Sequence, residues 1–215
     1  RLLLVPTMMV VAAITAPKPR KALATVEFES GETAELREET IARFHLRKGA
    51  QISELQWQDA LRVDALERCR AQAWKLLALR LRSRKELERA LRQRKHEAPV
   101  VELVLRELTE KNYLDDEAFA RQFARERAGR RQGRHRVQRD LMARGITREA
   151  AAKSALAATS PEHEEESARA ALARWNRRTK PEDPQKRTQA AAAFLLRRGF
   201  DSDLVWKLIR EFFNA

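Results

Sequence analysis

The stretch Leu141-Met142-Ala143-Arg144-Gly145-Ile146 returns later in the chain as Leu195-Leu196-Arg197-Arg198-Gly199-Phe200. An earlier copy, Leu91-Arg92-Gln93-Arg94-Lys95, begins with the same leucine and lacks the glycine. The three leucines lie about 50 residues apart, a spacing typical of repeat arrays. Apolar residues recur ten and seventeen positions after each leucine, although the polar residues differ. An array of small helical units forms a long surface rather than a pocket, which favours a large partner over a small substrate.

The composition of the 215-residue chain favours a helical protein with a core. Apolar residues make up 43% of it and charged residues 35%, and alanine, leucine, arginine and glutamate dominate. Aromatic residues are few. Cys69 is the only cysteine, which excludes an internal disulfide and a cysteine-based metal cluster and fits a reducing compartment. Because Cys69 falls in a helical pattern, we expect a small buried thiol rather than a nucleophile.

The net charge of +13 is unevenly distributed. Residues 1–66 carry 9 basic and 9 acidic side chains, whereas residues 67–215 carry 35 and 22. The density peaks between Ala118 and Arg144, with nine arginines, no lysine and only two acidic residues. A well-solvated face is one interpretation. The use of arginine alone favours an anion-binding surface, because its planar guanidinium makes bidentate contacts to phosphate and carboxylate.

The first sixteen residues allow two interpretations. Leu2–Ala16 is apolar and too short to span a bilayer, so we expect no membrane segment. One positive charge, an apolar run and small residues are similar to a signal peptide. Pro6 interrupts the run, however, and an arginine-rich, cysteine-poor sequence follows. We therefore favour a β-strand that ends at Pro17-Lys18-Pro19, in a cytoplasmic protein.

The next residues continue the pattern of short strands. Residues 24–28 alternate between apolar and polar side chains, Ser30-Gly31 is a turn dipeptide, and residues 33–36 return. We predict a small antiparallel meander over residues 7–37. A short helix over residues 38–46 should follow it.

Capping residues mark the helix starts from Ser53 onward. Ser53 with Gln56 and Ser83 with Glu86 form two capping boxes, so we interpret Ser83 as a structural cap rather than a nucleophile. Gly145 and Gly199 end helices at the position that favours glycine. These signals predict about nine helices in three triplets, with further starts at Pro99, Asp115 or Asp116, Thr147, Ser160-Pro161, Asp183-Pro184 and Asp201.

No motif in the chain would place a catalytic or metal centre. Asp115-Asp116-Glu117 are adjacent at a helix start and do not converge on one ion, so we interpret them as capping residues and select Asp116. The four histidines lack a partner at ligand spacing. Phosphate-binding glycine loops and hydrolase or metalloprotease motifs are absent from the sequence. We expect no catalytic residues, no metal and no cofactor.

Four groups of residues follow one another over residues 67–215. They are Arg80-Leu81-Arg82-Ser83 with Glu86-Leu87, Tyr113-Leu114-Asp115-Asp116 with Phe119-Ala120, Gly133 with Leu141 and Gly145-Ile146, and Phe194-Leu195 with Arg197-Arg198-Gly199-Phe200. Their order and spacing together resemble the RecX family of recombination regulators. The resemblance implies tandem three-helix repeats, no enzymatic activity, and binding in the groove of the RecA–DNA filament. It also implies limits on filament growth, ATP hydrolysis, strand exchange and coprotease activity, and weak DNA binding.

We therefore predict a mainly α-helical protein. Three tandem three-helix repeats should form an elongated curved array, with a small N-terminal extension of a β-meander plus helix. The predicted boundaries are 1–52 for the extension, 53–114 for the first repeat with its lead-in helix, 115–159 for the second repeat and 160–215 for the third. We expect a monomer, in which the charge-neutral extension is accessory to RecA binding. The Tyr113 ring should pack between two repeats, with stacking on a base as the competing interpretation.

The expected function is negative regulation of RecA by a rigid helical crescent that contacts more than one filament subunit. The alternative is a DNA-binding module that competes with RecA for single-stranded DNA, with double-stranded DNA as a further partner, and a structural adaptor comes third. The scarcity of stacking aromatics among the arginines favours a protein partner. The candidate contact residues are Arg125, Arg127, Arg130, Arg131, Arg134, Arg136, Arg139, Arg144, Arg197 and Arg198.

Overall fold

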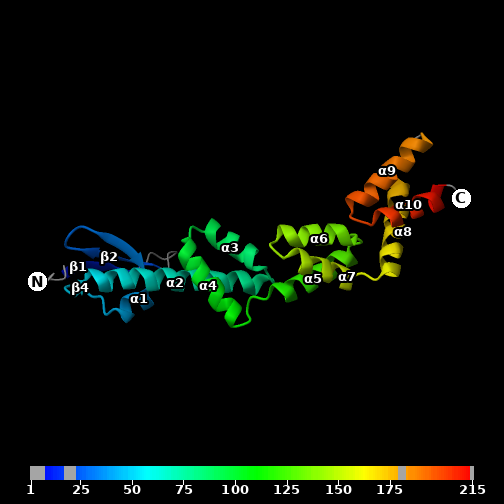
Figure 1. Cartoon of the computed structure of the whole chain (residues 1–215). Coiled ribbons are helices and arrows are strands. Elements are labelled where there is room, and N and C mark those ends of the chain that lie inside the picture. Colours follow the sequence, from blue (N-terminus) through cyan, green and yellow to red (C-terminus); the bar gives the residue numbers. More distant parts are fainter. Residues whose placement is uncertain (1–7, 17–22, 179–182, 214–215) are drawn as a thin grey trace, which may run out of the picture. The chain divides into compact units, whose positions relative to one another are not determined.

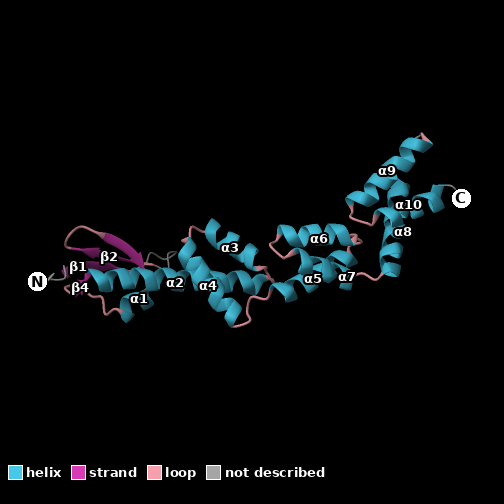
Figure 2. Cartoon of the chain, viewed as in Figure 1, coloured by secondary structure: helices cyan, strands magenta, loops and turns pink. Residues whose placement is uncertain are grey.

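The computed structural model describes residues 8–16, 23–178 and 183–213, which form ten helices and four strands (Figure 1, Figure 2). The prediction of a mainly helical protein with a small N-terminal sheet is confirmed. The expected break at Pro17-Lys18-Pro19 lies outside the described residues, as does the sequence before Met8. The chain divides into two compact units, one within Arg1–Leu76 and Leu91–Val104, the other within Leu77–Ala90 and Leu105–Ala215.

Four short strands form one antiparallel sheet in the N-terminal unit (Figure 2). Their order is β3-β2-β1-β4, with bounds Met8–Thr15 for β1, Ala24–Phe28 for β2, Thr33–Leu36 for β3 and Gln51–Ser53 for β4. Three of them match the predicted meander. The prediction missed β4, because three residues directly before a helix are too few to carry an alternating pattern. It pairs with the first three residues of β1.

Helix α1 (Glu38–Arg43) and the first half of α2 (Glu54–Leu79) contribute apolar residues to the core beside this sheet. Phe28 of β2 meets Trp57 of α2 edge to face, with ring centroids 4.7 Å apart. The buried Asp64 carboxylate accepts hydrogen bonds from the Arg37 backbone N–H at 2.8 Å and from the Thr40 hydroxyl at 3.0 Å. The start of α2 is therefore part of the N-terminal core.

Helices α2 to α10 form the three predicted triplets. Their remaining bounds are α3 Arg84–Gln93, α4 Ala98–Glu110, α5 Asp116–Gly129, α6 Arg134–Ala143, α7 Arg148–Ala157, α8 Pro161–Arg178, α9 Pro184–Arg197 and α10 Ser202–Phe213. The second repeat, α5 to α7, has its core around Leu141, and the third, α8 to α10, around Leu195. The three leucines that set the repeat, Leu91 included, are fully buried. The repeated stretch thus contributes the centre of each unit.

Most predicted helix starts have the expected cap. The side chain accepts a hydrogen bond from a first-turn amide at Ser53, Ser83, Thr147, Ser160, Asp183 and Asp201. Such a bond satisfies one of the amides that a helix start leaves without a partner.

The assignment of Asp116 as the cap of its own helix is wrong. Asp115 accepts the bonds from the Glu117 and Ala118 amides, at 2.8 and 2.9 Å. Asp116 instead accepts a bond from the backbone N–H of Arg84, the first residue of α3, at 2.7 Å. Two adjacent aspartates at a helix start are equivalent in sequence, and a contact 32 positions away distinguishes them.

The prediction of a packed Tyr113 ring is also wrong. Tyr113 is 54% exposed, whereas the neighbouring Leu114 is 4% exposed. The chain leaves α4 through Asn112, whose positive φ of 58° turns the backbone. Leu114, rather than the aromatic ring, is therefore the buried residue at the handover from the first repeat to the second.

Candidate functional site

Successive repeats meet at joints where the start of one middle helix packs against the end of the next. The start of α3 meets the end of α6, and the start of α6 meets the end of α9. Gly145 and Gly199 follow these helix ends with φ of 89° and 83°. A Cβ atom on Gly145 would stand 2.5 Å from the Lys85 Cβ, and one on Gly199 would overlap the backbone of Arg136. The left-handed turn favours glycine, and the close approach requires it.

In both joints, a residue that precedes the middle helix donates a hydrogen bond to the carbonyl of the arginine before the glycine. In the first, the Ser83 hydroxyl donates to the carbonyl of Arg144 at 2.6 Å. In the second, the backbone N–H of Gly133 donates to the carbonyl of Arg198 at 2.9 Å. Ser83 and Gly133 each precede a middle helix, and both arginines precede the glycine of the repeated stretch. The two joints are therefore built to one plan.

A carboxylate from the later repeat also caps the middle helix of the earlier one at each joint. Asp116 accepts from Arg84 in the first joint, and Glu164 of α8 accepts from the Arg134 backbone N–H at 3.1 Å in the second. The Arg134 side chain adds an ion pair with Asp201, at 2.6 Å. These contacts fix the second repeat against the third.

Each joint carries a surface groove lined from three corresponding places. In each groove, two lining residues lie four and three positions before the middle helix of the earlier repeat. Four more lie on the first helix of the later repeat, with the same spacing in both grooves. The last is the arginine that precedes Gly145 or Gly199. The joint-1 groove is lined in this order by Arg80, Leu81, Phe119, Gln122, Phe123, Glu126 and Arg144. The joint-2 groove is lined by Arg130, Arg131, Ala171, Arg174, Trp175, Arg178 and Arg198.

The joint-1 groove is occupied by its own side chains. The Glu86 carboxylate pairs with Arg80 at 2.7 Å and with Arg144 at 3.3 Å, instead of returning to the amide before its helix as in a full capping box. Arg127 and Arg144 lie over the Phe123 ring, 4.7 and 4.5 Å from its centroid. Because Glu86 pairs with two of its arginines and its volume is only about 210 Å³, we interpret this groove as architectural.

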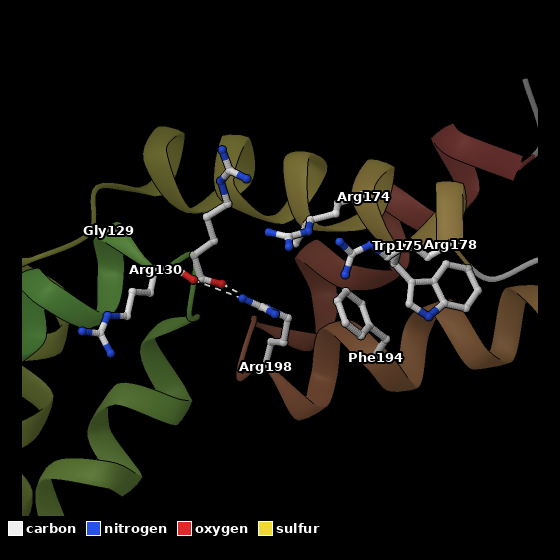
Figure 3. Close-up of a pocket in the computed structure, with 9 residues that line it drawn as sticks. Gly129, Arg130, Arg174, Trp175, Arg178, Phe194 and Arg198 are labelled. Atoms are coloured by element: carbon white, nitrogen blue, oxygen red, sulfur yellow. Dashed lines mark hydrogen bonds between the residues drawn. The ribbon is translucent and has the colours of Figure 1, made fainter.

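Figure 3 shows the residues of the joint-2 groove, which differs from the joint-1 groove in charge and size. Five arginines line it, Arg130, Arg131, Arg174, Arg178 and Arg198, together with Trp175 and Phe194. No acidic residue lines it, and no described carboxylate forms an ion pair with any of the five arginines. Its volume is about 440 Å³, twice that of the joint-1 groove. The same architectural position has become a cationic groove.

Arg198 is the most constrained of these cations. Its guanidinium donates to the carbonyls of Arg131 and Arg130, at 3.2 and 3.1 Å, as the dashed lines in Figure 3 mark. It also lies over the Phe194 ring, 5.5 Å from the centroid. Burial lowers the pKa of Arg198, and the neighbouring cations Arg136, Arg174 and Arg131 lower it further. A bound anion would offset this repulsion.

The predicted contact arginines separate into three groups. Arg130, Arg131 and Arg198 line the joint-2 groove. A second group is engaged in the fold. In it, Arg134 pairs with Asp201, Arg136 donates to the Arg197 carbonyl at 3.2 Å, and Arg127 and Arg144 stack on Phe123. The exposed remainder, with no side-chain partner among the described residues, is Arg125, Arg139 and Arg197.

Sequence reasoning missed half of the joint-2 groove. Four residues that complete the lining of the groove lie after the arginine-rich stretch 118–144 in the sequence. They are Arg174, Trp175, Arg178 and Phe194. The argument that aromatics are scarce among the arginines therefore fails here, since the Trp175 and Phe194 rings lie 6.2 Å apart inside the cluster. Arg174 and Arg178 stand four positions apart beside Trp175, a signal that the sequence does contain.

Other candidate groups have structural surroundings. Cys69 is buried, and burial raises the pKa of its thiol to about 11, which disfavours the nucleophilic thiolate. His135 lies 3.3 Å from the Asp201 carboxylate. Across residues 8–16, 23–178 and 183–213, no three His, Cys, Asp or Glu side chains gather as metal ligands would. No described helix has both the length and the apolar character needed to cross a membrane.

Comparison with known proteins gives one consistent family. Models of the first, second and third three-helix domains of RecX match residues 69–108, 115–154 and 163–209. The regulatory protein RecX of Thermobifida fusca is 33% identical over 71% of this chain and 82% of its own length. That of Streptomyces coelicolor is 32% identical over 69% and 79%.

Two solved structures have the same fold. A crystal structure of regulatory protein RecX superposes with a TM-score of 0.66 at 23% identity, covering 94% of this chain and 99% of that one. The structure of RecX from Lactobacillus salivarius gives 0.61 at 20% identity, covering 71% and 99%.

Proposed function

This chain belongs to the RecX family, and from that premise we propose that it is a non-enzymatic negative regulator of the RecA recombinase. It binds in the groove of the RecA–DNA filament in the cytoplasm, limiting filament growth and with it ATP hydrolysis, strand exchange and coprotease activity. The relatives are named regulatory proteins, which supports the regulatory role.

The observation that carries the proposal is the charge of the joint-2 groove. Five arginines without acidic partners in the described residues form a patch that attracts a polyanion, and the RecA–DNA filament is one. Glu164 and Asp201 hold the second and third repeats together at this joint, so the patch is presented on a fixed surface. The backbone that carries the patch therefore loses little conformational entropy on binding.

RecA ATPase activity on single-stranded DNA tests the proposal. Substoichiometric amounts of this protein should slow ATP hydrolysis, because a regulator of filament growth acts on many subunits at once. A triple variant, Arg125→Glu, Arg130→Glu and Arg131→Glu, should lose that effect. The matched control reverses three exposed arginines elsewhere, Arg89, Arg92 and Arg210, and so changes the net charge equally. Equal inhibition by both variants would contradict a specific arginine surface.

The alternative function is direct competition for single-stranded DNA, and Trp175 beside the arginines favours it. Salt separates the two mechanisms. A competitor for DNA should lose inhibition steeply and uniformly as salt rises, because its affinity comes from counterion release. A filament binder should retain a salt-resistant part of its effect from apolar contacts.

A further inference from the structure

We propose that the joint-2 groove takes one nucleotide of a single-stranded nucleic acid, with the base against Trp175 and the phosphate among the arginines. The inference deepens the proposed function at the same surface and rests on it for its setting in the filament. It assigns a ligand class and a stacking residue to a place that the fold alone leaves as a joint between repeats.

The size of the groove fits such a ligand. Small-molecule sites span about 300–1,000 Å³, and the joint-2 groove, at about 440 Å³, lies within that range. The joint-1 groove, at about 210 Å³, lies below it. Ala171 replaces the bulky Phe119 at the corresponding place, and Arg174 and Arg178 replace Gln122 and Glu126. The change to Ala171 removes bulk from the groove, and the changes to Arg174 and Arg178 make it cationic.

The charges fit a phosphate. Arginine binds phosphate through two parallel N–H donors, and such charge-assisted bonds are stronger than neutral ones. Arg198 is already oriented by its bonds to the Arg130 and Arg131 carbonyls. Arg174 and Arg178 approach from one helix turn of α8 (Figure 3). In the joint-1 groove the Glu86 carboxylate forms ion pairs with Arg80 and Arg144. The same fold therefore shows how a carboxylate binds the arginines at the corresponding place.

The aromatic residues distinguish a nucleotide from other anions. Trp175 and Phe194 are half-buried, with ring planes inclined by 30° and centroids 6.2 Å apart, and Trp175 lines the groove. Base stacking on an aromatic ring beside arginines is the usual mode of single-strand binding. A duplex keeps its bases stacked internally, and an acidic peptide uses the charges alone. The indole therefore favours an unpaired base.

Binding of the full chain to a fluorescein-labelled oligothymidylate, followed by fluorescence anisotropy, tests the inference. Trp175→Ala should weaken binding about 5- to 150-fold, which corresponds to about 1–3 kcal/mol for one stacked base. Trp175→Phe should keep most of the affinity. The control Trp206→Ala removes an exposed tryptophan outside the groove and should leave binding within about 2-fold, the scale of a small surface effect.

Charge and base are tested separately. Arg178→Gln should weaken binding more than Arg210→Gln, an equal loss of charge outside the groove. An abasic strand of equal length, the corresponding duplex, inorganic phosphate and a glutamate-rich peptide serve as competitors, and the abasic strand should compete worse than the oligothymidylate. Unchanged binding by Trp175→Ala would overturn the inference, as would an abasic strand or the peptide that competes equally well.

Circular dichroism and melting of each variant establish folding. If Trp175→Ala does not fold, Trp175→Phe with the abasic competitor still decides the role of the base. RecA is absent from these measurements, so their failure is distinct from that of the regulatory proposal, which the ATPase measurement decides.

Discussion

Gly199 lies against Arg136 so closely that a Cβ atom at residue 199 would overlap the Arg136 backbone nitrogen. Its φ of 83° disfavours any other residue as well. In the first joint, a Cβ atom on Gly145 would stand 2.5 Å from the Lys85 Cβ, whose position is fixed by the backbone. Neither joint should therefore tolerate a methyl group on its glycine.

Gly199→Ala should destabilise the C-terminal unit by about 2–5 kcal/mol, since left-handed backbone costs about 1–2 kcal/mol and overpacking about 1–3 kcal/mol. Gly145→Ala should also destabilise the protein, because the Lys85 Cβ can move away only together with its backbone. Gly129→Ala, in a helix with nothing within 4 Å, should cost nothing measurable. Urea unfolding checks the series, and a Gly199→Ala protein as stable as Gly129→Ala would contradict the joint.

The adjacent residues Asp115 and Asp116 should affect different helices when they are replaced. Asp115→Ala should cost about 0.5–2 kcal/mol through the start of α5, the usual value of a cap. Asp116→Ala should instead speed hydrogen exchange at the Arg84 amide, whose partner it removes. Asp116→Asn retains an acceptor and serves as control. Unchanged exchange at Arg84 in Asp116→Ala would show that the inter-repeat cap does not form in solution.

Sequence patterns could predict the repeat from its period of about 50 residues. They could also predict the triplets and most caps, because a cap and the amide that it satisfies lie within one helical turn. They could not predict the joints. The glycine of the repeated stretch indicates a helix end, and only the fold shows that Lys85 and Arg136 pack on it. The corresponding residue of the first repeat is Lys95, which has a φ of 65° without being glycine. The turn therefore does not by itself require glycine.

The candidate site was predictable only in part for the same reason. The arginine band indicated an anionic partner, but Arg134 and Arg144 within it are paired with Asp201 and Glu86 from distant positions. The groove that remains cationic combines the end of α5 with α8 and α9 (Figure 3). Trp175 enters it from outside the band. A charge count along the sequence cannot separate paired from unpaired cations.

The ion pair of Asp201 predicts acid sensitivity. The hydrogen bonds from Arg134 and then His135 lower the pKa of Asp201 from 3.8 to about 2. A lowered folded-state pKa adds stability above the unfolded value and loses it as the pH falls through the folded value. Wild-type melting temperature should therefore fall between about pH 4 and pH 2. Asp201→Asn keeps the acceptor for the Asp203 amide and should lose stability at pH 7.

The comparison of melting curves decides this point. The difference in melting temperature between wild type and Asp201→Asn should narrow across the same acid range. Asp203→Asn removes an exposed carboxylate two positions along the chain and should follow wild type throughout. A constant difference in melting temperature from pH 7 to pH 2 would show that Arg134 and His135 do not lower the pKa of Asp201.

Truncation of Leu114 to alanine should reduce the free energy of unfolding more than truncation of Tyr113. This reverses the usual order, in which loss of an aromatic ring costs more than loss of an aliphatic side chain. Tyr113→Ala should cost less than about 1 kcal/mol, because the ring is largely exposed, and Leu114→Ala about 2–5 kcal/mol as a buried leucine. Urea unfolding compares the two. A larger loss for Tyr113→Ala would restore the packed-ring hypothesis, and weaker oligonucleotide binding by a stable Tyr113→Ala would support a stacking role.

A test of the hypothesis that the N-terminal extension is accessory must also deal with the apolar surface that deletion of the extension exposes. A chain that starts at Glu54 keeps Trp57, which is 1% exposed and packs on Phe28 of the deleted sheet. That surface should cause aggregation. Truncation at Glu54 combined with Trp57→Gln and Leu61→Gln should give a soluble protein. Because the deleted residues are nearly neutral and the joint-2 groove is intact, this protein should inhibit RecA ATPase within a few-fold of wild type. Complete loss of inhibition by a truncated protein with native helical circular dichroism would place the sheet in the binding surface.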